Sequence, residues 1–195
     1  MGYAISWIAF KDKTGPQAAE MLALSCSGEF DEVPEGMFSG TLLDRGWYVV
    51  VIDKFGHAFV SDSSLRRLSA SGTVVAAVIE EHVMFCSAQE WNGGKVIWKV
   101  SHESEKGLRH LEEQGSLPEE YASIKQRLLA EQQREDQGAK EVDYVFEVPL
   151  QLAESIAGFK HDKALDAQFE ILRPMSSPTS GGLLSRLFRN KKRSG

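Results

Sequence analysis

The sequence has little of the chemistry that small proteins use for cross-links or metal sites. Its 195 residues include two cysteines, Cys26 and Cys86, which are too few for a disulfide framework or a thiolate zinc site. No run approaches the ~18 consecutive apolar residues of a membrane helix. The first residues show no basic segment before an apolar stretch, as a secretory signal would. We therefore expect a cytoplasmic protein with free thiols and with no metal or cofactor.

The signatures of well-known enzyme classes are also missing. The five histidines follow no H-x-x-x-H or H-E-x-x-H spacing, and neither G-x-S-x-G nor G-x-G-x-x-G occurs. The segment Asn92-Gly93-Gly94-Lys95 is rich in glycine, but we expect strands on both sides of it. A phosphate-binding loop lies between a strand and a helix, so this segment does not predict one.

Charge divides the chain into two parts. The formal net charge is −6, yet residues 174–195 hold five basic residues and no acidic one, which leaves 17 basic against 28 acidic residues in 1–173. An acidic body disfavours nucleic-acid binding, because phosphates need cationic partners. It suits a basic protein partner, since complementary charge steers encounter. We predict a compact acidic domain over 1–173 and a flexible basic tail over 174–195.

Apolar periodicity and turn residues predict a mixed order of strands and helices. Strands are expected over 4–10, 37–43, 47–54, 74–90, 95–103, 142–148 and 169–172. Helices are expected from Thr14, as the N-cap of a capping box with Gln17, to near Ser25, and over 62–71, 117–137 and 149–157. A loop is expected from Ser25 through Gly36. This order favours a single α+β domain, with an antiparallel-rich mixed sheet and helices packed mainly on one face.

The first candidate site lies on the strand predicted over 74–90. If Asn92-Gly93 forms a two-residue hairpin loop, His82 lies opposite Glu103, and strand alternation places Glu80 on the same face. An imidazole between carboxylates is typical of acid–base chemistry. The alternative is that these side chains decorate the solvated face of an antiparallel sheet, and a three-residue loop through Gly94 would remove the pairing.

The second candidate site is the basic tail. At helical spacing its apolar side chains form a stripe opposite its basic ones, which suits an anionic membrane surface or the groove of a partner. The alternative is a solubilising end without a binding role. The residues concerned are Leu183, Leu184, Arg186, Leu187, Phe188, Arg189, Lys191, Lys192 and Arg193.

Three segments together resemble a family of bacterial proteins of unknown function. They are Gly2–Ala9 (Gly-Tyr-Ala-Ile-Ser-Trp-Ile-Ala), Ile79–Ala88 (Ile-Glu-Glu-His-Val-Met-Phe-Cys-Ser-Ala) and Gly158–Asp162 (Gly-Phe-Lys-His-Asp). The resemblance covers residues 1 to about 172, and it implies a bacterial source and a single α+β domain. It implies no activity, cofactor or catalytic residue.

These observations favour a non-enzymatic protein-binding module, of which an immunity-type protein that neutralises a basic toxin is one concrete form. Two alternatives stay open. One is a small hydrolase- or transferase-like enzyme that uses His82, Glu80 and Glu103, and the other is a peripheral membrane protein attached through its tail. The sequence specifies neither the ligand nor the oligomeric state.

Overall fold

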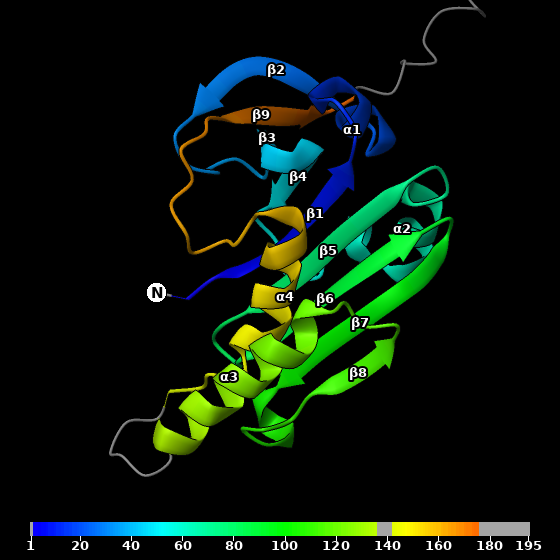
Figure 1. Cartoon of the computed structure of the whole chain (residues 1–195). Coiled ribbons are helices and arrows are strands. Elements are labelled where there is room, and N and C mark those ends of the chain that lie inside the picture. The colour runs from blue at the N-terminus through cyan, green and yellow to red at the C-terminus, as the bar shows by residue number, and fades with distance from the viewer. Residues whose placement is uncertain (1, 136–141, 176–195) are drawn as a thin grey trace, which may run out of the picture.

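The computed structural model describes residues 2–135 and 142–175, and its centre is one sheet of nine antiparallel strands (Figure 1). The strand order across the sheet is β2-β9-β3-β4-β1-β5-β6-β7-β8. The strands are β1 (Ala4–Lys11), β2 (Leu24–Asp31), β3 (Phe38–Leu43), β4 (Trp47–Ile52), β5 (Thr73–Glu80), β6 (Phe85–Asn92), β7 (Lys95–Glu103), β8 (Glu112–Gly115) and β9 (Phe169–Pro174). The α+β fold is confirmed, and every strand pairing is antiparallel.

Helices cover both faces of this sheet. The longer two, α3 (Glu120–Glu135) and α4 (Glu147–Ala157), lie together on one face, as Figure 1 shows. The shorter two, α1 (Gly15–Met21) and α2 (Asp62–Leu68), pack on the other face. Most of the helical surface is therefore on one face, as expected, and each face has its own apolar core.

The central strands explain the two cores. All six residues of β4 are buried, because both of its faces are covered. Along this strand Val49 faces the core under α3 and α4, whereas Val50 faces the core under α1 and α2. Strand residues alternate between the two faces, so a strand buried on both sides is apolar at every position.

Local capping fixes the helix ends that the sequence predicted. The Thr14 hydroxyl accepts a hydrogen bond from the Gln17 N–H, and the Gln17 side chain accepts one from the Thr14 N–H, which completes the capping box. Ser61 caps α2 in a similar way through the Ser64 N–H. Helix α4 ends at Gly158, whose left-handed conformation (φ 80°) favours glycine.

Three predicted elements were wrong. The loop expected up to Gly36 contains the strand β2, which pairs with β9 after a turn at Ala23 with φ 55°. The strand expected over 74–90 is two strands, β5 and β6, joined by a turn over 81–84. The strand expected over 142–148 is a turn followed by the start of α4, because Asp143 accepts hydrogen bonds from the Val145 and Phe146 N–H groups.

The predicted register of the β6–β7 hairpin was also wrong. Gly93 and Gly94 form its loop, both with positive φ, and Asn92 pairs with Lys95. A bulge between Glu90 and Trp91 shifts the pairing again. Glu103 therefore lies opposite Phe85, and the pairing of Glu103 with His82 does not form.

The sheet ends in two different edge strands. β8 was not expected, and all four of its residues (Glu-Glu-Gln-Gly) are exposed. β2 at the other edge changes register between Cys26 and Phe30, around Gly28 with φ 78°. Within the described part of the chain, no helix has the length and apolarity that crossing a membrane requires. The predicted tail site over 183–193 lies outside the described residues.

Candidate functional site

His82 and Glu80 meet at the turn between β5 and β6. The His82 Nδ1 lies 2.7 Å from a Glu80 carboxylate oxygen, which also accepts a hydrogen bond from the His82 N–H. The His82 side chain is 62% exposed. Glu80 and His82 were expected on one face of a single strand; they meet instead across the turn over 81–84, at the surface.

A small hollow beside this turn joins Glu80 to Glu103. Its volume is about 200 Å³. The lining residues are Phe55, Glu80, Val83, Phe85, Glu103 and Glu105. His82 does not line it. Two of the three predicted site residues thus share one concave surface, which we call the acidic pocket.

The walls of the acidic pocket are held by contacts between distant segments. The Phe55 and Phe85 rings meet edge to face with centroids 5.9 Å apart. Ser104 joins β7 to the β5–β6 turn, because its hydroxyl donates to the Val83 carbonyl and its N–H donates to the Met84 carbonyl. These contacts give a defined shape to the apolar part of the pocket, which consists of Phe55, Val83 and Phe85.

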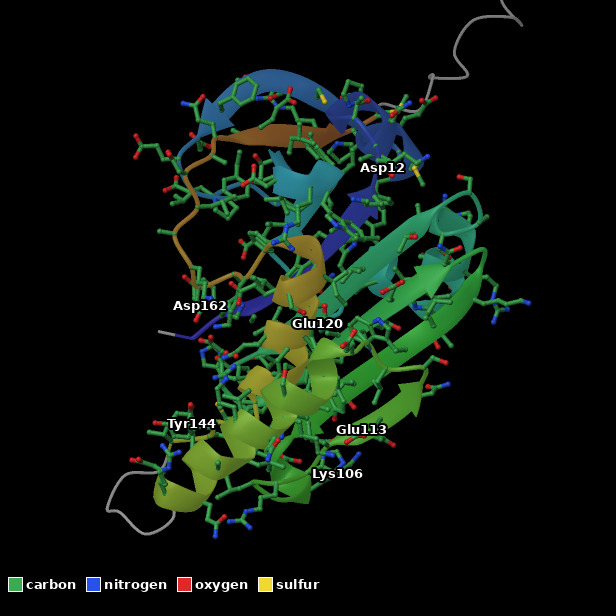
Figure 2. The ribbon with its side chains drawn as sticks, viewed as in Figure 1. Asp12, Lys106, Glu113, Glu120, Tyr144 and Asp162 are labelled. Atoms are coloured by element: carbon green, nitrogen blue, oxygen red, sulfur yellow. The ribbon has the colours of Figure 1, made fainter. Side chains whose placement is uncertain are left out.

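The rim of the acidic pocket carries an excess of negative charge. Lys106 forms an ion pair with Glu103 at 2.8 Å, and this contact raises the pKa of Lys106. Figure 2 shows Lys106 near the end of the sheet. Among the described residues, Glu105 has no ion-pair partner. A lining that combines apolar side chains with carboxylates suits a side chain with an aliphatic stem and a cationic head.

A second titratable pair lies inside the core. His102 is fully buried on β7, and its Nε2 lies 2.9 Å from Asp143, whose side chain is also buried. The His102 Nδ1 lies 2.8 Å from the His110 carbonyl. A carbonyl oxygen only accepts, so Nδ1 carries a hydrogen; the Nε2 contact then needs a further proton on Nε2 or on the carboxyl group.

Cys86 completes a cysteine–histidine–aspartate group without catalytic character. It pairs with His102 across β6 and β7, and its thiol donates to the Phe146 carbonyl at 3.0 Å. Burial raises the pKa of Cys86 well above its ordinary value, and the charges of Glu147 and Asp143 add to the effect. A nucleophilic cysteine needs its thiolate and access to substrate. This group is therefore structural.

The segment after α4 carries two basic residues, Lys160 and His161, whose side chains contact acidic residues. The Lys160 side chain is 5% exposed, and its ammonium lies 3.0 Å from Glu147 and 2.7 Å from Asp162. The His161 Nε2 lies 3.1 Å from Glu81, and its ring packs edge to face on Tyr3. Figure 2 shows Asp162 beside the start of β1. These contacts fasten the segment to the sheet.

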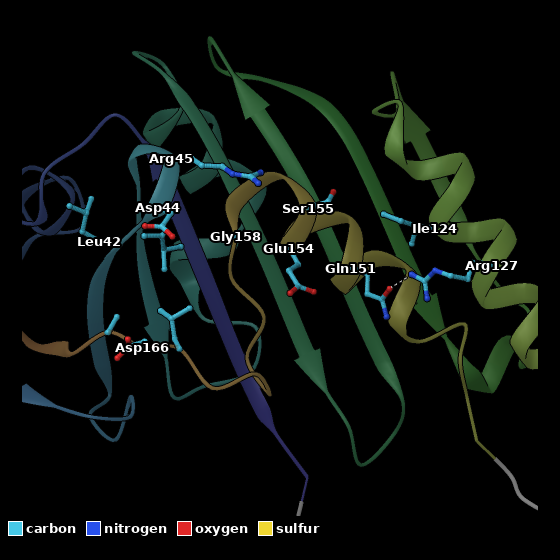
Figure 3. Close-up of a pocket in the computed structure, with 13 residues that line it drawn as sticks. Leu42, Asp44, Arg45, Ile124, Arg127, Gln151, Glu154, Ser155, Gly158 and Asp166 are labelled. Atoms are coloured by element: carbon cyan, nitrogen blue, oxygen red, sulfur yellow. Dashed lines mark hydrogen bonds between the residues drawn. The ribbon is translucent and has the colours of Figure 1, made fainter.

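A larger cavity of about 590 Å³ lies across the outer side of α4 (Figure 3). It is bounded by the β3–β4 turn, by α3, by α4 and by the segment after α4. Its lining residues are Leu42, Leu43, Asp44, Arg45, Ile124, Arg127, Gln151, Glu154, Ser155, Gly158, Leu165, Asp166 and Ala167. None of Glu80, His82 and Glu103 lies in it.

Sequence reasoning missed the buried pair, although one signal was present. Trp98, Val100 and His102 alternate along β7 and therefore share its buried face. Asp143 could not be found in this way, because it approaches from the turn before α4. In residues 2–135 and 142–175 no group of three His, Cys, Asp or Glu side chains could hold a metal ion.

Comparison with known proteins identifies no relative. No protein-family model, curated protein or solved structure matches this chain. The resemblance to a bacterial family therefore stays a prediction, and function has to be argued from the geometry of the two pockets and the buried pair.

Proposed function

We propose that this protein is a protein-binding module that receives a lysine or arginine side chain of a partner in the acidic pocket. The observation that carries the proposal is the composition of that pocket. Its lining combines three apolar side chains, Phe55, Val83 and Phe85, with three acidic ones, Glu80, Glu103 and Glu105.

Exposure of the apolar side chains supports a protein partner. Phe55 and Val83 are 41% and 50% exposed although both are large apolar side chains. A partner that covers them removes apolar surface from water, at roughly 25 cal/mol per Å². The acidic charge of residues 1–173 adds long-range attraction for a basic protein. A protein that neutralises a basic toxin is one concrete form of such a module.

We place this activity in the cytoplasm, and we assign the chain to a bacterial source because three of its segments resemble a bacterial family. Cys26 and Cys86 are both free, which suits a reducing compartment. The basic tail is an additional element of the proposal, as a segment that attaches to an anionic surface. The acid–base enzyme is less well supported, because His82 lies outside the pocket.

The test measures binding of short peptides to the whole chain. The probes are acetyl-Gly-Arg-Gly amide, its lysine counterpart, and the citrulline peptide as the uncharged shape match of arginine. Binding is followed by NMR shifts of Phe55, Val83 and Phe85. We expect the two cationic peptides to bind and the citrulline peptide to bind about tenfold more weakly, a difference of about 1.4 kcal/mol.

A pair of double variants separates the pocket from bulk charge. Glu103→Gln with Glu105→Gln removes two carboxylates from the rim, and Glu32→Gln with Glu35→Gln removes two exposed carboxylates from the loop after β2. Both variants change the net charge equally. Loss of binding in the first variant alone supports the proposal. Equal loss in both variants, or none in either, overturns it.

A further inference from the structure

The large cavity over α4 has the size of a ligand site. Its volume of about 590 Å³ falls within the ~300–1,000 Å³ typical of small-molecule pockets. It is separate from the acidic pocket, with which it shares no lining residue among those the structure describes. A ligand in this cavity is therefore independent of the partner proposed for the acidic pocket.

Arg45 occupies an unfavourable backbone position at the edge of this cavity. Its φ of 66° and ψ of 17° lie in the left-handed region, where glycine or asparagine is favoured. The turn is held by the end of β1, because the Lys11 ammonium donates to the Arg45 carbonyl and the N–H of Asp12, the next residue, donates to the Gly46 carbonyl. Such strain often accompanies a functional side chain.

The Arg45 guanidinium has no hydrogen-bond or ion-pair partner among the described residues. Figure 3 shows it reaching from the turn toward the C-terminal end of α4. Arg127 reaches the cavity from α3 on the other side, and Gln151 holds its guanidinium. Arg127 also pairs with Glu131 at 3.7 Å and lies toward the other end of α4 from Arg45 in Figure 3, so Arg45 is the arginine of this cavity that can take up an anionic group.

The cavity also holds three acidic residues, Asp44 beside Arg45 in the β3–β4 turn, Glu154 on α4 and Asp166 in the segment after α4. Glu154 is neutralised by Lys163 at 2.6 Å. Asp44 and Asp166 have no ion-pair partner within the described parts of the chain. Figure 3 shows Asp166 well apart from Arg45. A simple anion would be repelled by these carboxylates, and a simple cation would be repelled by the arginines.

We infer that this cavity binds a small zwitterion, an α-amino acid or dipeptide with apolar side chains. Its carboxylate lies toward Arg45, and its ammonium group lies toward Asp44 and Asp166. Leucine and isoleucine side chains supply the apolar contacts of the cavity; they are Leu42, Leu43, Ile124 and Leu165. Each charged side chain of the cavity that has no ion-pair partner among the described residues then has a complement on the ligand.

The test uses L-leucine and leucyl-leucine as probes, each with two blocked forms. N-acetylation removes the ammonium charge, and amidation removes the carboxylate. Shifts of the Ile124 and Leu165 methyl groups report binding to the whole chain. We expect at least one zwitterion to bind, and both of its blocked forms to bind at least tenfold more weakly.

Arg45→Gly is the matching variant, because it removes the guanidinium and also relieves the positive φ. We expect it to lose at least tenfold in affinity while its thermal midpoint stays the same or rises, so that unfolding does not explain the loss. Arg173→Gln, outside the cavity, is expected to leave binding unchanged. Equal binding of zwitterions and blocked forms, unchanged binding by Arg45→Gly, or no methyl shifts at about 10 mM probe overturns the inference.

Discussion

The His102 imidazole lies 2.9 Å from the Asp143 carboxylate, and both side chains are buried between β7 and the start of α4. Asp143 also accepts two backbone hydrogen bonds, from Val145 and Phe146. One aspartate therefore connects the sheet to the turn that leads into α4. Removing its partner leaves an uncompensated buried carboxyl group, which is costly.

We expect His102→Phe to lower the free energy of unfolding by about 3–5 kcal/mol, in the range measured when a buried pair loses one member. The matched control is His82→Phe, which breaks an exposed pair with Glu80. We expect the control to cost no more than about 1 kcal/mol. Urea unfolding followed by circular dichroism measures both values. A similar loss of unfolding free energy in the two variants would show that the buried pair stabilises the fold no more than the exposed one.

Cysteine reactivity gives a second prediction. Burial, together with a hydrogen bond and the charge of Glu170, raises the pKa of Cys26 to about 11. Its thiolate fraction at neutral pH is then about one hundredth of that of an ordinary cysteine. Glu170→Gln should lower this pKa and speed alkylation by iodoacetamide.

The control for this experiment is Cys86, which is buried and hydrogen-bonded to the Phe146 carbonyl. In a Cys26→Ala background we expect Cys86 to react only as fast as the protein unfolds. Rapid alkylation of Cys86 in the native protein would contradict its structural assignment.

The buried ammonium of Lys160 is the subject of a third prediction. Lys160→Met keeps the aliphatic stem and leaves Glu147 and Asp162 without their partner. Because the Asp162 side chain is 40% exposed, we expect a loss of about 1–3 kcal/mol, less than for a fully buried pair. Glu29→Gln, in the exposed pair with Arg173, should cost no more than about 0.5 kcal/mol by the same urea measurement.

The same contacts predict how stability depends on pH. Burial raises the pKa of Asp162, but the hydrogen bonds and charge of Lys160 outweigh it, so the pKa falls below 3.8. This contribution is present above pH 3.8 and is lost as the pH falls through the folded pKa. Asp162→Asn should make the unfolding free energy depend less on pH in this acid range.

Lys160 gives the opposite sign. Burial lowers its pKa, but Asp162 and Glu147 outweigh this effect and raise the pKa above 10.5. Its contribution is present below pH 10.5 and is lost as the pH rises through the folded pKa. If the loss of unfolding free energy at alkaline pH is the same in Lys160→Met as in the unmodified protein, Lys160 is not its source.

Gly40 gives a prediction from packing. It lies in β3, and a Cβ at this position would come within 2.8 Å of the Tyr48 Cζ atom. We expect Gly40→Ala to cost about 1–3 kcal/mol through overpacking. Gly72→Ala, where a Cβ meets nothing within 4 Å, should change thermal stability by less than about 0.5 kcal/mol. Equal midpoints for the two variants would show that Tyr48 moves aside freely.

The sequence predicted the elements that have strong local signals. The capping box at Thr14 and Gln17, the apolar strand β4 and the end of α4 at Ala157 depend on neighbouring residues alone, and all three are confirmed. Polar edge strands gave no such signal. β8 reads Glu-Glu-Gln-Gly and exists because β7 offers a free edge for pairing.

The candidate site was predicted only in part, for a reason of register. Glu80 and Glu103 do lie on one concave surface, but the turn over 81–84 takes His82 out of the strand. One bulge and a loop displaced by one residue changed every cross-strand partner in the β6–β7 hairpin. The cavity over α4 combines segments far apart in the chain, so no local pattern could reveal it.

The two edges of the sheet restrict how a partner can attach. An open edge strand normally invites another chain to continue the sheet through backbone hydrogen bonds. Here β8 presents Glu112 and Glu113, and β2 is distorted at Gly28, so neither end is a regular template. A partner of the kind proposed above would therefore bind through side chains, which can distinguish one partner sequence from another, and growth into fibres is discouraged at both ends.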